Sequence, residues 1–159
     1  MRIRDLTNDD LPRVLELNNA ATPAVSPLDR AGLDKLAEMA VVQLGAEADG
    51  AVVGFALGFG PGAPYGSENY RYFAERLADF CYIDRIVVDP TYYRRGIGSA
   101  LYDEVERRCT AAVLTCEVNI KPRNEESLAF HAKRGFAEVD TQETGGGTTT
   151  VALMQKPLR

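Results

Sequence analysis

Hydrophobic and polar positions follow two different periods along the chain. In some segments apolar residues recur every three or four positions, as on the buried face of a helix, and in others they form short runs typical of strands. The helical period predicts helices over residues 8–20, 28–40, 98–109 and 124–135. The strand-like segments are 3–6, 41–48, 51–59, 80–89, 112–120, 136–140 and 148–155.

The order of these elements predicts a mixed α/β (α+β) sheet. A strand and two helices come first, followed by three strands, a helix, a strand, a helix and two strands. Asp49-Gly50 makes a hairpin of residues 41–48 and 51–59, and the glycines of residues 144–150 turn the chain before the last strand. Hairpins at both ends with helices between the later strands favour an open sheet over a barrel.

Composition places the chain among soluble globular proteins. Its 159 residues suffice for one domain over residues 1–159, and 45% of them are hydrophobic and 26% charged. A formal net charge of −5 argues against nucleic-acid binding. No apolar run reaches the ~20 residues of a membrane span, and the charged start is unlike a secretory signal. We therefore expect a cytoplasmic protein that does not bind membranes.

Metal binding is not expected from the side chains available. The chain has one histidine and three scattered cysteines, Cys81, Cys109 and Cys116, without CxxC spacing. The cysteines read as small buried residues of a reducing compartment. No base is signalled beside Cys81 or Cys116, which argues against a covalent cysteine nucleophile.

A glycine-rich turn follows the strand over residues 80–89. In "VVDPTYYRRGIGSALY" (87–102), Gly96 and Gly98 allow the backbone to approach a ligand closely. The next helix directs the positive end of its dipole there, and Arg94 and Arg95 add charge that suits phosphate. The third glycine of a dinucleotide fingerprint and the lysine of a P-loop are absent. The turn predicts a phosphate cradle, with an ordinary helix entry as the alternative.

The same stretch resembles the acetyl-CoA loop of the GNAT N-acyltransferases, whose pattern is Gln/Arg-x-x-Gly-x-Gly/Ala. Gly96 and Gly98 match it, whereas Tyr93 replaces the Gln/Arg. Further along, "NEESLAFHAKRGF" (124–136) is similar to the family's helix Asn-x-x-Ala-x-x-Leu-Tyr-x-x-x-Gly-Phe. The element order matches as well. The resemblance implies a GNAT-like, mostly antiparallel central sheet of about seven strands flanked by about four helices.

The resemblance also implies acetyl-CoA as cosubstrate and no metal. It implies that the main chain of Ile86, Val87 and Val88 holds the pantetheine arm, with one N–H group polarising the thioester oxygen. The other implied coenzyme A contacts come from the glycine-rich turn and the start of the last helix: Arg94, Arg95, Gly96, Ile97, Gly98, Ser99 and Asn124.

The single histidine, His131, occupies the position at which the family usually has a tyrosine. In relatives that hydroxyl protonates the leaving thiolate. An imidazolium with a pKa of about 6.5 could do the same for a thiol of about 8.5. His131 shares a helical stripe with Leu128 and Ala132, so a hydrogen-bonded core histidine is the alternative interpretation.

A general base is needed, because an alkyl amine is protonated at pH 7. In "TCEVNI" (115–120), strand alternation places Glu117 on the same face as Thr115, and a mid-strand carboxylate is costly to bury without purpose or partner. The stretch also resembles the Glu-Val strand of the family's peptide N-terminal acetyltransferases, which implies that Glu117 is the base. A glutamate paired with Arg85 is the alternative. Asp84 is the second candidate, as base or as ligand of the substrate ammonium.

Residues 60–73 contain too many glycines and prolines for regular structure and predict a long loop. Tyr65 and Tyr70 in it are candidate substrate-binding residues, unless they only pack the loop down. Together with these candidate residues, the resemblance implies an N-acetyltransferase that acts by direct transfer from acetyl-CoA to a small amine, an amino acid or a peptide N-terminus, and a homodimer is compatible with it. The competing interpretations are a non-catalytic acyl-CoA-binding or sensor protein on the same fold, a nucleotide-phosphate binder and an interaction module without ligand.

Overall fold

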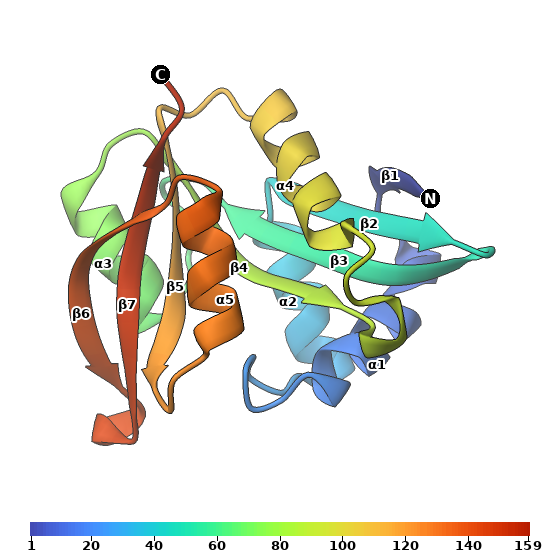
Figure 1. Ribbon diagram of the computed structural model, residues 1–159, viewed down its shortest axis with the longest axis horizontal. Coiled ribbons are helices and arrows are strands. Elements are labelled where there is room, and N and C mark those ends of the chain that lie inside the picture. The colour runs from blue at the N-terminus through green and yellow to red at the C-terminus, as the bar shows by residue number, and fades with distance from the viewer. The chain divides into compact units, whose positions relative to one another are not determined.

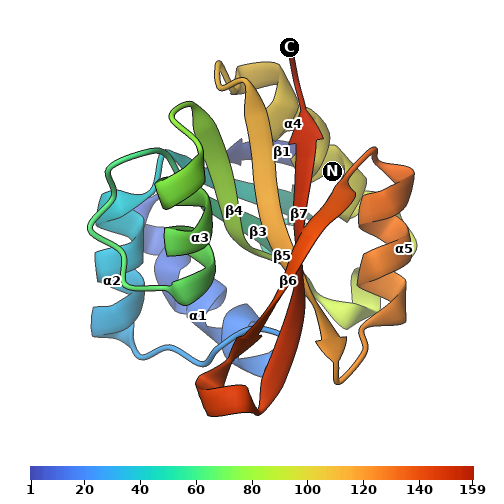
Figure 2. The same cartoon turned by 90° about the vertical axis from the view of Figure 1, so that its left-hand side faces the viewer.

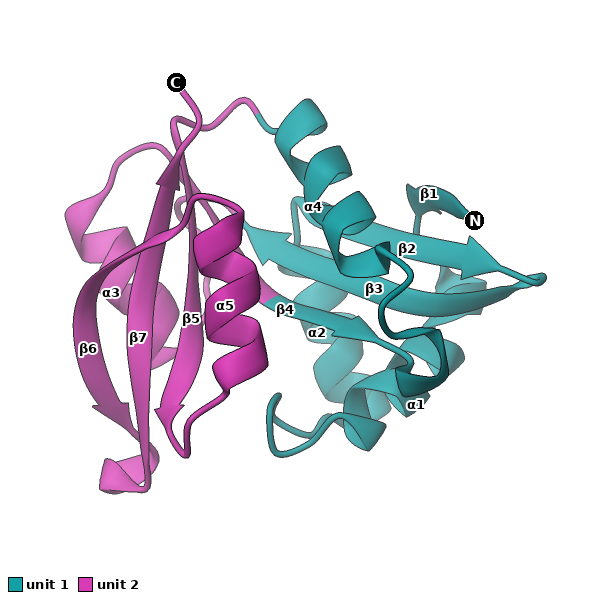
Figure 3. Cartoon of the chain, in the orientation of Figure 1, with its two compact units in different colours: residues 1–59, 85–109 teal, residues 60–84, 110–159 magenta.

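The chain folds into two compact units in the computed structural model, which describes residues 1–159. Unit 1 comprises residues 1–59 and 85–109, and unit 2 comprises residues 60–84 and 110–159 (Figure 3). Strand β4 (Phe80–Val88) contributes to both units, because the boundary falls within it. The single domain expected from the length of the chain stays a prediction.

Unit 1 consists of strands with helices on both faces. The helices α1 and α2 lie on one face of the strands and α4 lies on the other (Figure 1). The elements are β1 (Arg2–Asp5), α1 (Leu11–Ala20), α2 (Arg30–Met39), β2 (Val42–Ala48), β3 (Ala51–Phe59), the end of β4 and α4 (Ile97–Arg108). Strand β2 pairs antiparallel with β1 and with β3. All residues of β3 from Val52 to Phe59 are buried, so this strand forms the centre of the unit 1 core.

A glycine in β3 lets β4 and α4 come close to it. A Cβ atom on Gly54 would lie 3.0 Å from the carbonyl oxygen of Val87 and 3.2 Å from Cγ2 of Ile97. A side chain at this position would push the strand or the first residue of the helix away. Gly54 therefore helps to position the two elements that the glycine-rich turn connects.

Unit 2 is built on the same plan. Its elements are α3 (Glu68–Arg76), the start of β4, β5 (Val113–Lys121), α5 (Glu125–Lys133), β6 (Ala137–Thr144) and β7 (Thr149–Pro157). Strand β7 pairs antiparallel with β5 and with β6. Figures 1 and 2 show α3 and α5 on opposite faces of these strands.

The strands have the order β1-β2-β3-β4-β5-β7-β6 in a seven-stranded sheet. The β4–β5 pair is parallel, whereas the β1–β2, β2–β3, β5–β7 and β6–β7 pairs are antiparallel. The α/β class and the mixed, mostly antiparallel sheet are confirmed.

One expected loop is partly wrong. Residues 60–73 were expected to be irregular, but α3 begins within them at Glu68 and adds a fifth α-helix. The side chain of Ser67 caps this helix by accepting a hydrogen bond of 3.3 Å from the Tyr70 N–H group. Tyr70 and Phe73 then bury one face. The glycines and prolines that precede Ser67 conceal this helical period.

Candidate active site

The glycine-rich turn of unit 1 ends in a helix start without a side-chain cap. Arg94 and Gly96 both have left-handed backbone angles, with φ of 65° and 76°. Gly96 is the N-cap of α4, and no side chain caps the helix there. A Cβ on Gly96 would have nothing within 4 Å. The twelve-residue helix α4 therefore begins at a glycine with open space beside it, and the N–H groups of a helix start favour an anion.

The residues expected to contact coenzyme A in this turn differ in exposure. Arg94, Arg95 and Gly96 are exposed, and Gly98 and Ser99 are partly exposed. The side chain of Ile97 is buried, with 3% exposure, so this residue can offer only its main chain.

The entry to the turn is fixed by Asp89. Its Oδ1 atom accepts a hydrogen bond of 2.9 Å from the Thr91 N–H group, and its Oδ2 atom pairs with Arg13 at 2.8 Å. The hydrogen bonds from Thr91, with a smaller contribution from Arg13, lower the pKa of Asp89. Arg13 also donates to the Val52 carbonyl oxygen at 3.0 Å. An ionised Asp89 thus ties the turn to α1 and β3.

The strand before the turn contains the expected pantetheine contacts. Val87 is buried, and Ile86 and Val88 are partly exposed. Directly after them, the Asp89 N–H group donates to the Val53 carbonyl oxygen at 2.8 Å, which holds this end of β4 to β3. The role of the three main-chain groups toward pantetheine stays a prediction.

Unit 2 places two carboxylates at the point where strand pairing stops. The parallel pairing of β4 and β5 ends with Tyr82 opposite Thr115. Asp84 and Glu117 lie two residues further along their strands, so they share a register and a face. Both side chains are partly exposed. The β4–β5 pairing therefore does not extend to these two residues.

Tyr82 holds one of these carboxylates. Its hydroxyl group donates a hydrogen bond of 2.6 Å to Oε2 of Glu117. The tyrosine is fully buried, with 0% exposure. Burial, followed by the charges of Glu117 and Asp84, raises the pKa of Tyr82 well above its usual value of 10.0, so the hydroxyl stays protonated and remains a donor.

Tyr65 holds the other carboxylate. Its hydroxyl donates to Oδ1 of Asp84 at 2.8 Å. The ring of Tyr65 lies 5.8 Å from that of Tyr70, which in turn contacts the edge of Tyr82 at 5.6 Å. The two expected substrate contacts Tyr65 and Asp84 are thus brought together.

Tyr70 is buried and anchors the preceding loop. Its hydroxyl donates to the Gly60 carbonyl oxygen at 2.6 Å and accepts from the Ala63 N–H group at 3.1 Å. The ring is 2% exposed. These contacts support the interpretation that Tyr70 packs the loop down. The Tyr70 ring also contacts the ring of Tyr65.

His131 is buried in α5, with 4% exposure. Its Nδ1 atom lies 2.8 Å from the Ser127 carbonyl oxygen, which can only accept, so Nδ1 carries the proton and Nε2 of the neutral ring is the acceptor. The rings of Phe130 and Phe136 meet it edge-on at 5.2 and 5.3 Å. Burial, with a smaller contribution from Arg134, lowers the pKa of His131 below 6.5. The imidazole is therefore mainly neutral at pH 7.

Asn124 begins the same helix as its cap. Its side-chain oxygen accepts a hydrogen bond of 3.2 Å from the Ser127 N–H group. This contact gives Asn124 a structural role as the N-terminal cap of α5. Its expected contact with coenzyme A stays a prediction.

The described residues contain no group of histidine, cysteine or acidic side chains that could hold a metal ion. No helix is both long and apolar enough to cross a membrane.

The model of the Acetyltransferase (GNAT) family matches residues 3–136. The chain belongs to the GNAT acetyltransferase family. It is thus an acyltransferase enzyme, and the family resemblance carried by the two sequence motifs is confirmed.

Solved structures of GNAT proteins cover the whole length of the chain. A ribosomal-protein-alanine N-acetyltransferase from Brucella melitensis is 26% identical, with a TM-score of 0.70 and 99% of each chain covered. The putative acetyltransferase yncA from Salmonella typhimurium, solved with acetyl-CoA, is 21% identical, with a TM-score of 0.72, 100% of this chain and 94% of that chain covered. The GNAT-like decarboxylase GphF in complex with isobutyryl-CoA is 17% identical, with a TM-score of 0.77 and 100% of each chain covered. No curated protein matches the chain.

Sequence reasoning about this GNAT enzyme overlooked one residue, Tyr82. The signal was present in "YIDRIVVD" (82–89), because a tyrosine two positions before Asp84 must share its face of the strand. What the sequence could not supply was the parallel register, which brings Tyr82 opposite Thr115 and within reach of Glu117.

Proposed function

We propose that this GNAT enzyme transfers an acetyl group from acetyl-CoA to a primary amine by direct transfer. The observation that carries the proposal is the pair of carboxylates, Asp84 and Glu117, each held by a tyrosine hydroxyl just beyond the end of the β4–β5 pairing. A group that accepts a proton and a group that binds an ammonium ion are what an amine acceptor requires.

The residues of the turn before α4 fit acetyl-CoA. The open space at Gly96, the helix start without a side-chain cap and the exposed Arg94 and Arg95 suit a diphosphate. Bound acetyl-CoA supplies a thioester, whose acetyl carbon forms the new bond to nitrogen as its bond to sulfur breaks. The main chain of residues 86–88 is the proposed pantetheine contact.

Glu117 is the proposed base. An amine is a nucleophile only after it loses the ammonium proton. The Glu117 carboxylate accepts this proton either on Oε1 or, once the hydrogen bond from Tyr82 breaks, on Oε2. Asp84 binds the ammonium form before transfer, with Tyr65 fixing its orientation. Two carboxylates on the same face of neighbouring strands suit a cationic acceptor.

His131 is the proposed proton donor to the departing sulfur. Only its imidazolium form carries a proton at Nε2, because Nδ1–H is engaged with Ser127. The lowered pKa makes this form a minor one at neutral pH and at the same time a stronger acid. The catalytic contribution of His131 is therefore expected to grow as the pH falls.

The acceptor class with most support is a peptide N-terminus. One similar structure, 26% identical to the chain, is a ribosomal-protein-alanine N-acetyltransferase. Small amines and free amino acids are the other members of the proposed class, and the carboxylate pair suits the ammonium group that all three share.

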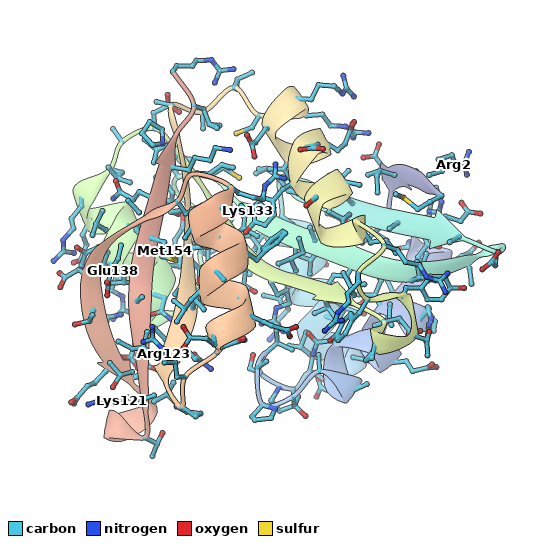
Figure 4. All side chains as sticks on the ribbon, in the orientation of Figure 1. Arg2, Lys121, Arg123, Lys133, Glu138 and Met154 are labelled. Atoms are coloured by element: carbon cyan, nitrogen blue, oxygen red, sulfur yellow. The ribbon has the colours of Figure 1, made fainter.

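The test is a transfer assay with acetyl-CoA against a panel of peptides with free N-termini, amino acids and small amines. Product mass and thiol release are measured together. We expect an acetylated amine, and a Glu117→Gln variant with kcat/KM lowered about 10²- to 10⁴-fold. Glu138→Gln on the exposed strand β6 (Figure 4) removes the same charge and should leave the rate unchanged. Thiol release without an acetylated amine would refute the proposal.

A further inference from the structure

Two residues of the glycine-rich turn and one residue of the β2–β3 hairpin meet in unit 1. The hydroxyl group of Tyr92 donates a hydrogen bond of 2.7 Å to Oδ2 of Asp49. The guanidinium carbon of Arg95 lies 4.8 Å from the centre of the Tyr92 ring. We call this arrangement the Asp49–Tyr92–Arg95 triad. It links the turn between β2 and β3 to the residue that stands directly before the glycine cap of α4.

Both ends of the contact are fixed by local structure. Asp49 and Gly50 have φ of 53° and 77°, the left-handed angles of a tight two-residue hairpin turn. Tyr92 ends a short 3-10 turn (Pro90–Tyr92) that Asp89 caps through Thr91. The hydrogen bond to Asp49 raises the pKa of Tyr92, which keeps its hydroxyl protonated. The phenol ring thus has a defined place before any ligand arrives.

The ring in turn limits where the Arg95 side chain can lie. An exposed arginine is otherwise free to sample many rotamers, and ordering it when a ligand binds lowers the affinity. A guanidinium is attracted to the face of a phenol ring, and a carboxylate that accepts from the phenol increases the electron density of that face. None of the ion pairs of the structure includes Arg95, so its charge is not matched by a carboxylate.

We propose that Asp49 and Tyr92 are positioning residues that hold Arg95 ready for a phosphate group of coenzyme A. The inference rests on the proposed use of acetyl-CoA and adds two residues that lie outside the glycine motif. Tyr92 and Asp49 act through Arg95, so their effect must require both the arginine and a phosphate.

The test compares coenzyme A with pantetheine, which shares the thiol arm and has no phosphate. Dissociation constants are measured for the full-length protein and its variants. Tyr92→Phe removes the bond to Asp49 and keeps the ring, and it should weaken coenzyme A binding about threefold; Tyr92→Leu should weaken it about tenfold. Pantetheine binding should change by less than about twofold in both variants. In an Arg95→Ala background, neither substitution should weaken coenzyme A binding further.

Unit 2 offers a matched control. Tyr72 of α3 donates to Asp140 of β6 at 3.1 Å, and Arg76 of α3 lies 3.7 Å from the centre of the Tyr72 ring, so the same three residue types form the same arrangement there. Tyr72→Phe should leave the binding of both ligands unchanged. An equal loss for coenzyme A and pantetheine in the Tyr92 variants would overturn the proposal, as would no loss at all.

The outcome separates this inference from the proposed transfer reaction. A wild-type protein that binds coenzyme A without acetylating any amine would contradict the proposed function, and the variants would still decide the role of the triad. A wild-type protein that binds no coenzyme A would overturn both.

Discussion

The bond between Tyr82 and Glu117 joins a fully buried donor to the proposed base. Hydrogen bonds to a charged carboxylate favour its ionised form. Because the raised pKa of Tyr82 keeps its proton in place, the donor is present throughout the range in which the enzyme would work. The tyrosine therefore orients the carboxylate and remains its hydrogen-bond donor.

Tyr82→Phe should shift the pH dependence of catalysis. The ring contacts with Tyr70 and Phe73 persist in the variant, while Glu117 loses a donor that stabilises its charge. The acidic limb of the kcat/KM profile should therefore move to higher pH, by about one unit. Glu117→Gln should abolish this limb. A Tyr82→Phe profile that falls uniformly, without any shift, would mean that the tyrosine serves packing only.

His131 can be tested by the ratio of two rates. Because burial lowers the pKa of His131 from its usual value of 6.5, the imidazolium form disappears as the pH rises through this lowered pKa. The ratio of wild-type kcat to that of His131→Phe should be largest at acidic pH, up to about 10²-fold, and should fall toward one as the pH approaches neutrality. Dividing the two rates removes ionisations common to both proteins.

A tyrosine variant provides the control for this experiment. His131→Tyr restores the side chain usual in the GNAT family at this position, and its turnover should not decline as the pH rises toward neutrality. A ratio that stays constant across the pH range would assign His131 to the core formed with Phe130 and Phe136.

The sequence predicted the strand face on which a side chain lies better than it predicted the residue that this side chain contacts. Strand alternation correctly grouped Glu117 with Thr115, because side-chain direction has a period of two that needs no knowledge of neighbours. The bond from Tyr82 to Glu117 joins residues 35 positions apart and depends on the register of two parallel strands. No local pattern fixes that register, so the bond between Tyr82 and Glu117 could not be found from the sequence alone.

At the scale of elements, the contrast between local patterns and contacts of distant residues explains why helix α3 was not predicted. The hairpin at Asp49-Gly50 and the start of α4 after Gly96 were predictable, since both depend on left-handed residues that the sequence shows directly. Helix α3 depends on burial of Tyr70 and Phe73 against strands that lie elsewhere in the chain. Its nine residues would be marginal in isolation, so tertiary packing decides it.

Gly96→Ala should weaken acetyl-CoA binding through the backbone of the helix start. The φ of 76° is strained for alanine by roughly 1–2 kcal/mol, whereas no neighbouring atom obstructs a Cβ. Relief of this strain moves the first N–H groups of α4, and the added methyl group enters the open space beside them. We expect a loss of affinity of about tenfold or more, measured by calorimetry.

Gly146→Ala is the matched control for that variant. Gly146 has a φ of 70°, and a Cβ atom added to it would also have nothing within 4 Å, but it lies in the turn between β6 and β7. Both variants should lose similar thermal stability, and only Gly96→Ala should lose affinity. Equal affinity in both variants would contradict an anion site at the start of α4.

At the scale of the whole molecule, ionised carboxylates contribute to the stability of an acidic chain. The formal net charge is −5, yet arginines of unit 1 pair with carboxylates at several places, among them Asp10, Asp89 and Glu104. The Asp10 side chain is the most buried of these three, with 12% exposure. Arg4 donates to both of its oxygens, at 2.7 and 3.0 Å, and Thr7 donates its N–H group at 2.7 Å. These bonds, above all those from Arg4, lower the pKa of Asp10 to about 2.

The sign of the resulting pH dependence follows from proton binding. The pKa of Asp10 is 3.8 in the unfolded chain and about 2 in the folded protein. At a pH between these two values, Asp10 is mostly protonated in the unfolded chain and mostly ionised in the folded protein. The stabilisation is therefore complete above pH 4 and is lost as the pH falls toward 2. Allowing for solvent screening of a pair that is partly exposed, we expect about 1 kcal/mol.

Asp10→Asn should remove this part of the pH dependence. Urea unfolding at pH 6 should show a free energy of unfolding about 1 kcal/mol below that of the wild type, and the difference should shrink toward zero near pH 2. The exposed neighbour Asp9 is the control, because Asp9→Asn makes the same change in net charge without touching Arg4. If the two variants lose the same stability at every pH, the effect belongs to the net charge of the molecule; a loss confined to Asp10→Asn and to pH values above 4 assigns it to the paired carboxylate.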